Sequence, residues 1–197
     1  MKAWSTCLLF AMVACSSPET DAVETVSFET VDEIRTEDSI ESSARVQEAS
    51  PFILPNEVLV LSFKTKKNKQ LFICRDRDNK YLVYRFGSKP KVELQYPVKP
   101  DSSSFKKFDY SAYFRPGGLE NLGMSLDYLS FINKGYRYLI YKTYIAEAVG
   151  NENEIGIRII HLKTGKETMI EGDFDTLEGG FSAETMELVN QSEELYE

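Results

Sequence analysis

Between Gln70 and Pro97 the sequence leaves no room for a helix. Three short runs of aromatic and β-branched residues, Leu71–Arg75, Tyr81–Phe86 and Val92–Tyr96, are separated by polar segments of turn-forming residues. Side chains alternate between the two faces of a strand, and the middle run places one apolar and one mixed set on its two faces. A helix would need apolar residues three and four positions apart, and these runs are too short to have them. The stretch predicts an antiparallel meander of three strands.

Similar runs precede and follow this stretch. They are Glu57–Lys64, Phe108–Arg115, Met124–Ile132, Tyr136–Ile145, Ile155–Leu162 and Glu167–Glu171. Short Gly-containing or Lys-rich segments join most of them, as in β-hairpins. About nine strands with short connections predict an all-β domain, an antiparallel meander that forms a small barrel or a sandwich. Ser182–Glu194 alone suggests a short C-terminal helix, with Ser182 as its cap.

Charge divides the 197-residue chain into three parts. The formal net charge is -8, but residues 16–50 hold ten acidic and two basic residues, 51–170 hold twelve acidic and twenty basic, and 171–197 hold nine acidic and none basic. We expect a basic all-β domain over 51–171, between a disordered acidic tether at 16–50 and an acidic C-terminal tail at 172–197. The tether is predicted to be disordered because its scattered apolar residues cannot bury enough surface to offset the cost of ordering. The alternative is an acidic segment that covers the basic domain.

The first fifteen residues, MKAWSTCLLFAMVAC, have the pattern of a secretory signal peptide. Their apolar run is too short to cross a bilayer as a retained helix. Met12-Val-Ala-Cys15 resembles the lipobox of bacterial lipoproteins. The resemblance implies that residues 1–15 form a lipoprotein signal peptide and that Cys15 becomes the lipidated first residue of the mature chain. The alternative is an ordinary cleaved signal that contains Cys15.

The lipoprotein resemblance also implies a location in the cell envelope. Several acyl chains would hold the protein on a membrane far more firmly than a single chain does. In Gram-negative lipoproteins an Asp after the lipidated Cys usually retains the protein in the inner membrane, and Ser16 stands there in this chain. The outer membrane is therefore the favoured location.

Residues for nucleophilic or metal chemistry are scarce. Beyond Cys15 the chain has one thiol, Cys74, so no disulfide can form within the domain, and we interpret Cys74 as a small buried hydrophobe. A reactive thiol would need a nearby base, and His161, the single histidine, lies on a distant predicted strand. Neither a catalytic triad nor a zinc site has its parts.

Three other segments suggest chemistry but lack a necessary part. Asp76–Lys80 begins like a calcium loop, yet Lys80 stands where a third oxygen ligand is needed, so we predict a hairpin turn. The Gly-rich Pro116–Gly123 lacks the Lys-Ser/Thr and helix of a phosphate loop, although its amides and Arg115 could receive an anion. Glu93 and Asp127 could act as an acid and a base, as in glycosidases, but nothing in their spacing brings them together. We expect no enzyme, cofactor or metal.

Aromatic and cationic residues give the candidate binding surface. Tyr81 shares a strand face with Arg85, and three tyrosines of Tyr136–Ile145 share a face with Lys142. Such amphipathic sets are favoured at interfaces, although the tyrosines could instead fill the core. The predicted binding residues are Arg85, Arg115, Lys134 and Tyr136. An exported protein meets little nucleic acid, so an anionic cell-wall polymer, a lipid headgroup or an acidic protein is the expected partner.

Two resemblances concern the domain itself. Its segments YLVYRFG (81–87) and VELQYP (92–97), with YLSF (128–131) and GYRY (135–138), resemble those of bacterial secreted β-proteins that are uncharacterised. A small exported β-barrel with a Gly-Tyr hairpin near Lys134 is also similar to periplasmic lysozyme inhibitors, which insert a loop into the lysozyme cleft. We therefore expect a membrane-tethered module that binds an anionic envelope component or a protein. The alternative that the second resemblance implies is an inhibitor of a lysozyme-type cell-wall hydrolase.

Overall fold

Ten strands pair side by side in one sheet, in the order β10-β5-β6-β7-β8-β9-β1-β2-β3-β4. All pairs are antiparallel except β10 with β5. The strands are β1 Glu57–Thr65, β2 Gln70–Asp76, β3 Leu82–Ser88, β4 Lys91–Tyr96, β5 Asp109–Arg115, β6 Met124–Asn133, β7 Tyr136–Glu147, β8 Gly150–His161, β9 Glu167–Gly179 and β10 Asn190–Gln191. A 3-10 turn, η1 Ser104–Lys107, and a short helix, α1 Ala183–Met186, accompany them. The end strands β10 and β4 do not pair, so the sheet is open.

This computed structural model describes residues 50–119, 121–147 and 150–194, which belong to one unit bounded by Arg45 and Glu197. The predicted signal peptide, Cys15 and the predicted tether as far as residue 49 lie outside the described residues. Within the described ranges no helix is long and apolar enough to cross a membrane. The all-β prediction is confirmed, and every one of the predicted strands is present.

Turn chemistry explains where the strands stop. Asn68 and Asn79, in the turns after β1 and β2, have φ of 60° and 58°, the left-handed region that Asn tolerates better than most residues. Lys134 and Gly135 both have positive φ, at 49° and 80°, between β6 and β7. Two consecutive positive φ values characterise the tight hairpin turn whose twist matches the strands that it joins.

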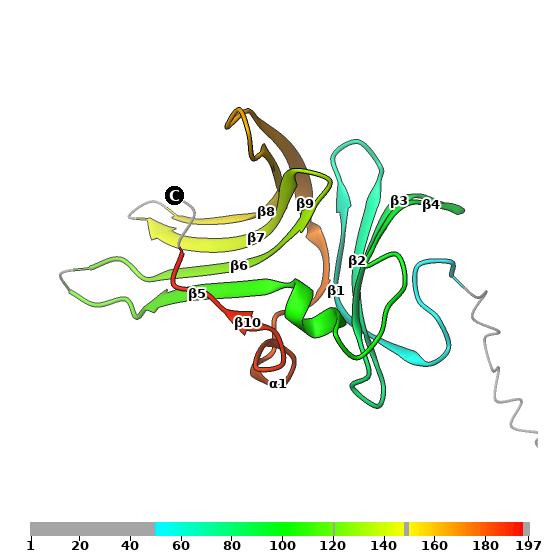
Figure 1. The fold of residues 1–197 in the computed structure, drawn as a ribbon. Coiled ribbons are helices and arrows are strands. Elements are labelled where there is room, and N and C mark those ends of the chain that lie inside the picture. Colours follow the sequence, from blue (N-terminus) through cyan, green and yellow to red (C-terminus); the bar gives the residue numbers. More distant parts are fainter. Residues whose placement is uncertain (1–49, 120, 148–149, 195–197) are drawn as a thin grey trace, which may run out of the picture. The chain divides into compact units, whose positions relative to one another are not determined.

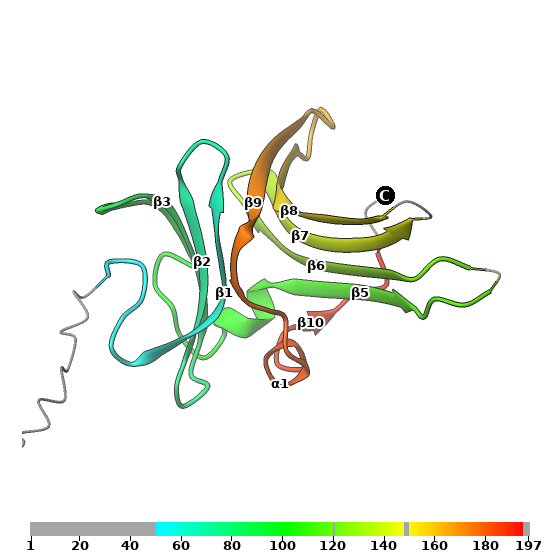
Figure 2. The same ribbon diagram turned by 180° about the vertical axis from the view of Figure 1, so that it is seen from behind.

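Phe131 of β6 lies at the centre of the core. Its ring stacks on Tyr96 of β4 with centroids 4.2 Å apart and on Tyr138 of β7 at 5.0 Å, while Tyr84 of β3 and Phe108 contact it at 4.9 and 5.5 Å. Strands β3 and β4 are distant from β6 in the sheet order, so the sheet must fold over on itself to bring these rings together. Figures 1 and 2 show this arrangement, with β1–β4 crossing β5–β8.

The C-terminal residues complete the core, which corrects the predicted boundary at residue 171. Strand β9 continues to Gly179 and pairs with β1, and the α1 region buries Met186 and Val189 at 2% exposure each. Residues 172–194 are therefore part of the fold and not a tail. Acidic composition obscured this because the acidic side chains alternate with apolar ones that face inward. The helix expected over 182–194 is limited to α1, although Ser182 does precede it as the N-cap residue.

Strand β9 changes its partner halfway along. It pairs with β8 as far as Glu171 and with β1 from Gly172 onward. A Cβ atom on Gly172 would lie 2.7 Å from the carbonyl oxygen of Ile155 and 2.8 Å from the ring of Phe63, so only glycine allows this close crossing. The part of β8 before Gly156 pairs with β7 alone, and a pocket opens between β8 and β9.

Candidate functional site

Lysines gather in four hairpin turns. The turns β1–β2, β3–β4, β6–β7 and β8–β9, with the first residue of β4, contain eight lysines and no acidic residue. We refer to the following residues as the lysine turns: Lys66, Lys67, Lys69, Lys89, Lys91, Lys134, Lys163 and Lys166.

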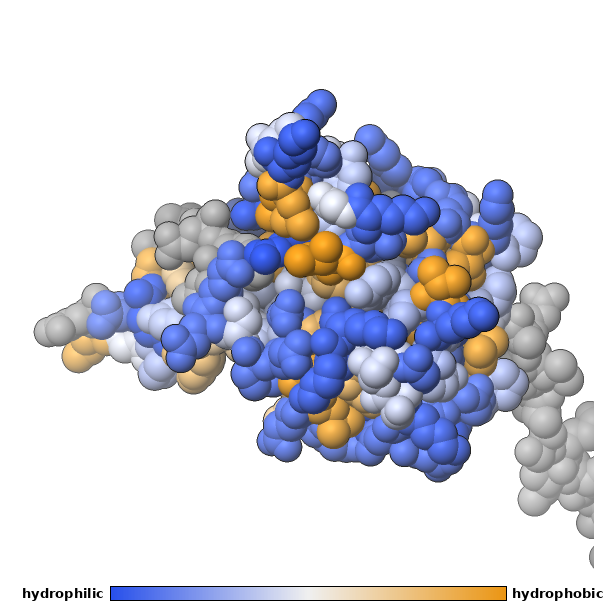
Figure 3. Space-filling view, viewed as in Figure 1, coloured by the Kyte–Doolittle hydropathy of each residue, from blue (hydrophilic) through white to orange (hydrophobic). Residues whose placement is uncertain are grey.

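These turns lie at one end of the sheet. The amide of Leu162 donates to the carbonyl oxygen of Gly135 at 3.0 Å, which joins the β8–β9 turn to the β6–β7 turn. The amide of Lys66 donates to the carbonyl oxygen of Glu171 at 3.0 Å, which joins the β1–β2 turn to β9. In Figures 1 and 2 the β1–β2, β6–β7 and β8–β9 hairpins all point to the upper edge, and that edge is mostly hydrophilic in Figure 3.

Most of the positive charge at this end is unneutralised. Lys66 Nζ lies 2.6 Å from Glu171 Oε2, and this hydrogen bond and charge raise the pKa of Lys66. Lys69 Nζ lies 2.5 Å from Glu93 Oε2, and this bond lowers the pKa of Glu93. The other six lysine-turn residues form no ion pair with any residue that the structure describes. They remain available to an anionic ligand.

The structure places Lys134 and Tyr136 together at this end. Tyr136 is 40% exposed, and its ring lies edge-on to His161 with centroids 4.8 Å apart. His161 Nδ1 in turn lies 2.7 Å from Thr164 Oγ1, which fixes the imidazole against the β8–β9 turn. Ile132 and Leu162 are also exposed at this end. Ile132 pairs with Arg137, so its side chain lies on the face of the sheet opposite to Tyr136. By contrast Tyr138, predicted on the same face as Tyr136, packs in the core.

Arg115 lies far from these residues. It pairs with Met124 at the start of β6, whereas Lys134 follows the last residue of that strand. Ten strand residues span about 30 Å. The Arg115 Nε donates to the carbonyl oxygen of Leu122 at 3.0 Å, across its own hairpin. The structure therefore does not bring Arg115 into one site with Lys134 and Tyr136.

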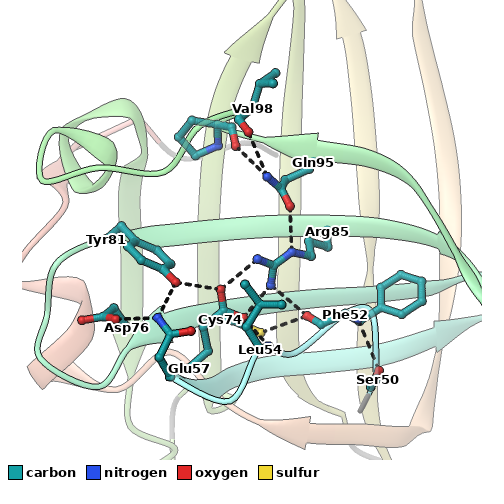
Figure 4. Close-up of polar contacts among 12 residues, drawn as sticks. Ser50, Phe52, Leu54, Glu57, Cys74, Asp76, Tyr81, Arg85, Gln95 and Val98 are labelled. Atoms are coloured by element: carbon teal, nitrogen blue, oxygen red, sulfur yellow. Dashed lines mark hydrogen bonds and ion pairs between the residues drawn. The ribbon is translucent and has the colours of Figure 1, made fainter.

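Arg85 is buried, which corrects its prediction as a surface binding residue. Its side chain is 3% exposed and that of Glu57 is fully buried. Arg85 donates to both carboxylate oxygens of Glu57, at 2.6 and 2.8 Å, and also to the carbonyl oxygen of Phe52 and to Gln95 Oε1 (Figure 4). Its donors are occupied within the protein, so Arg85 has a structural role.

The segment before β1 covers this ion pair. Phe52 is fully buried and its ring lies 5.0 Å from that of Phe72. The Tyr81 hydroxyl donates to Glu57 Oε1 at 3.1 Å, and Asn56 Nδ2 donates to that hydroxyl at 2.8 Å. Figure 4 shows Tyr81, Glu57 and Arg85 in one polar network next to the segment. These hydrogen bonds hold the segment before β1 against the sheet.

Both partners of the buried pair are held in their charged forms. Burial by itself would raise the pKa of Glu57, but the hydrogen bonds from Arg85 and from the Leu54 amide outweigh burial and lower it. Burial would likewise lower the pKa of Arg85, but Glu57 outweighs it and raises the pKa. A charged, fully paired network of this kind is structural chemistry and needs no ligand.

The structure confirms the interpretation of Cys74 as a small buried residue. It is free and has 0% exposure. Burial, followed by the nearby Glu57 charge, raises the pKa of its thiol to about 12. The thiolate is the reactive form, so this thiol is inert in the folded protein.

The pocket between β8 and β9 has a volume of about 340 Å³. Its lining includes Lys66, Tyr141 and Phe174. Five carboxylates also line it, those of Glu152, Glu154, Glu171, Asp173 and Asp175. This acidic lining does not suit an anion, so an anionic ligand would meet the exposed turns and not this pocket.

The structure also places the residues that were considered for calcium binding and for acid–base chemistry. Asp76 Oδ1 accepts from the amides of Asp78 and Lys80 at 3.0 and 3.3 Å, which confirms a hairpin turn. Glu93 bonds to Lys69, whereas Asp127 accepts from the Tyr110 hydroxyl on a separate strand pair. In the part of the chain that the structure describes, no group of three or more His, Cys, Asp or Glu could hold a metal.

The sequence analysis predicted Lys134 and Tyr136 as binding residues but did not name the other lysine turns at the same end of the sheet. A signal for them was present, because every second turn of a meander lies at the same end of the sheet and each of these turns carries lysine. No such signal marks Glu57 as the partner of Arg85, since their contact crosses β2.

In comparisons with protein-family models, curated proteins and solved structures, no match to this chain is found.

Proposed function

We propose that this chain is an exported, lipid-anchored protein whose all-β domain binds an anionic component of the cell envelope. The lysine turns carry the proposal, because they place eight cations at one end of the sheet, and six of these form no ion pair with any residue that the structure describes. Lysines scattered over a solvated surface would alternate with acidic residues, as they do elsewhere on this domain. A cluster of one sign attracts a polyanionic partner and favours fast association.

The anchor rests on the sequence around Cys15. Lipidation there would concentrate the domain at a membrane, to which the acidic segment 16–50 would connect it. Replacing Cys15 with Ser should abolish fatty-acid labelling and release the protein from the membrane fraction. Labelling that persists in this variant would contradict the lipoprotein assignment.

Binding to anionic vesicles tests the lysine turns. The probe is the full chain with Cys15→Ser, mixed with phosphatidylglycerol vesicles, phosphatidylcholine vesicles or a purified anionic cell-wall polymer. We expect it to bind one or both anionic probes, not phosphatidylcholine, and to bind more weakly at high salt because salt screens exposed charges. The two anionic probes distinguish a lipid headgroup from a wall polymer.

Charge reversal supplies the matched comparison. The triple variant Lys67→Glu, Lys134→Glu, Lys163→Glu reverses the charge of three lysines that form no ion pair, in three of the four turns. The control Arg77→Glu, Lys80→Glu, Lys99→Glu changes the net charge equally at exposed positions outside these turns. A lysine near an anionic surface contributes about 1 kcal/mol, so the first variant should lose at least about a hundredfold in apparent affinity. Equal losses of affinity in both variants would show that only net charge matters and would rule out a binding site at the lysine turns.

Inhibition of a lysozyme-type cell-wall hydrolase remains the alternative proposal. The tight Lys134-Gly135 turn with exposed Tyr136 beside it is the feature that supports it. Cationic lysozymes would be repelled by the lysine turns, so an anionic hydrolase is the better target. An assay of wall lysis with the full chain, with and without Tyr136→Ala, tests this alternative, and undiminished lysis by every lysozyme class would remove it.

A further inference from the structure

Strand β5 has a free edge. It pairs with β6 along its whole length, from Asp109 to Arg115, but β10 pairs with Asp109 and Tyr110 alone. Within the described ranges no other strand pairs with the remaining five residues, Ser111–Arg115. Figure 1 shows β5 along the lower border of strands β5–β8, with β10 beside the part nearest α1.

The direction of the backbone groups on this edge is fixed. The amides of Asn190 and Ser192 donate to the carbonyl oxygens of Phe108 and Tyr110, so these two residues turn their backbone polar groups away from β6. Backbone groups alternate in direction along a strand. Ala112 and Phe114 therefore direct their N–H and C=O groups outward, toward solvent.

The opposite edge of the sheet is better protected than this one. Strand β4 carries exposed Lys91 and Glu93, lies between Pro90 and Pro97, and has a bulge where it pairs with β3. Charged residues, prolines and bulges are the devices that keep an edge strand from pairing with another chain. The free part of β5 is followed by Pro116, but it has no charge before Arg115, no proline within it and no bulge in its pairing with β6.

Apolar side chains accompany the free edge. Tyr113 is 38% and Phe114 75% exposed, and Leu119 and Leu122 of the following loop are exposed as well. Figure 3 shows hydrophobic residues at the projecting left end of the molecule, where this hairpin lies. An unprotected edge with exposed aromatic residues is a pairing surface.

We propose that β5 pairs antiparallel with β5 of a second copy, about a two-fold axis at Tyr113. In this register Ala112 of each copy lies opposite Phe114 of the other, and both residues have outward backbone groups. Two hydrogen-bonded pairs then flank a Tyr113–Tyr113 pair, which is the alternation that an antiparallel ladder requires. The two sheets become one continuous sheet of twenty strands.

A second copy is favoured over a different strand because the edge complements itself. Ala112 and Phe114, the two residues with unused outward backbone groups, lie symmetrically about Tyr113, so each finds a free partner in the second copy, and β10 keeps its pairing with Asp109 and Tyr110. Arg115 of the second copy would lie opposite Ser111, next to the point where the chain leaves β5 at Ser192 and continues into exposed Glu193. Opposite charges at this position support the same register. A two-fold interface of this kind is the commonest arrangement in homo-oligomers.

Site-specific disulfide formation tests the register. In the full chain with Cys7→Ser and Cys15→Ser, the change Tyr113→Cys puts two cysteines opposite each other, with Cα atoms about 4.5 Å apart. The matched control is Arg115→Cys, whose two copies would be about 14 Å apart along the strands. We expect a disulfide-linked dimer with Tyr113→Cys, at least tenfold more than with Arg115→Cys. Cys74 is buried and stays in both variants.

Sedimentation of the full chain gives the second measurement. The same parent chain should show a concentration-dependent monomer–dimer equilibrium. Ala112→Pro should weaken it at least tenfold, because proline removes an outward donor and is tolerated on an edge strand. Circular dichroism checks that each variant is folded. A parent that sediments as a monomer at all concentrations, equal cross-linking at both cysteine positions, or cross-links to a different protein would overturn the proposal.

Discussion

Arg85 and Glu57 form a two-pronged ion pair across strand β2, with N···O distances of 2.6 and 2.8 Å and almost no exposure to solvent. The segment around Phe52 closes over them, and Phe52 itself supplies a further acceptor through its carbonyl oxygen. The pair therefore ties three strands and the segment before β1 to one another. Its energetics follow from burial, because removing one partner leaves the other charge without compensation.

Glu57→Gln should lower the free energy of unfolding by about 3–5 kcal/mol, the usual effect of breaking a buried ion pair. Urea denaturation at pH 7, followed by circular dichroism, measures it. Glu171→Gln breaks the exposed pair with Lys66 and should leave stability almost unchanged. Similar losses in the two variants would mean that the buried pair contributes no more to the free energy of unfolding than the exposed pair does.

Removal of both charges should cost less than removal of one. The double variant Glu57→Met, Arg85→Met replaces the pair with apolar side chains, which in other buried pairs is often neutral or stabilising. The same urea measurement should place the double variant above Glu57→Gln in stability. A double variant less stable than Glu57→Gln would show that the hydrogen bonds to Phe52 and Gln95 dominate.

Stability should fall at acid pH, in part through Glu57. Its pKa is lowered in the folded protein, so the unfolded chain binds a proton at higher pH than the folded one does. The stabilisation is complete above the ordinary carboxyl pKa of about 4.3 and is lost as the pH falls through the lowered folded value. The double variant lacks this contribution. The unfolding free energy of the parent, taken relative to that of the double variant, should therefore fall between pH 5 and pH 3, and a constant difference would contradict the lowered pKa.

The strands were predictable because their pattern is local, and the partners were not. Alternation and turn residues placed β1 to β8 without knowledge of the fold. The same patterns could not show that Arg85 contacts Glu57. A surface position and a buried position on a strand look alike in the sequence when the segment that covers the strand, here Ser50–Asn56, is not known. The continuation of β9 to Gly179 was missed for a related reason, because its acidic residues masked the apolar ones that fill the core.

Phe131→Ala should destabilise the domain by about 3–5 kcal/mol, because it removes the ring on which Tyr96, Tyr84 and Tyr138 pack and leaves a cavity. Thermal and urea unfolding of the full chain measure the effect. Val98→Ala, which shortens a side chain that is 78% exposed, is the control and should change stability by less than about 0.5 kcal/mol. A comparable loss in the control would mean that the ring cluster contributes no more to stability than an exposed side chain does.

Cys74 should resist thiol reagents until the domain unfolds. Its thiol is fully buried with a pKa raised to about 12, so almost no thiolate is present at pH 8 and no reagent can reach it. In the chain with Cys7→Ser and Cys15→Ser, a disulfide reagent should leave Cys74 unmodified for hours and modify it completely in 8 M urea. The rate of modification at intermediate urea then reports opening of the sheet beneath Phe52. Adding Glu57→Gln should raise that rate, because the variant weakens the segment that covers Cys74 without touching the thiol. Rapid modification of the parent without urea would mean that this segment is open in the native protein.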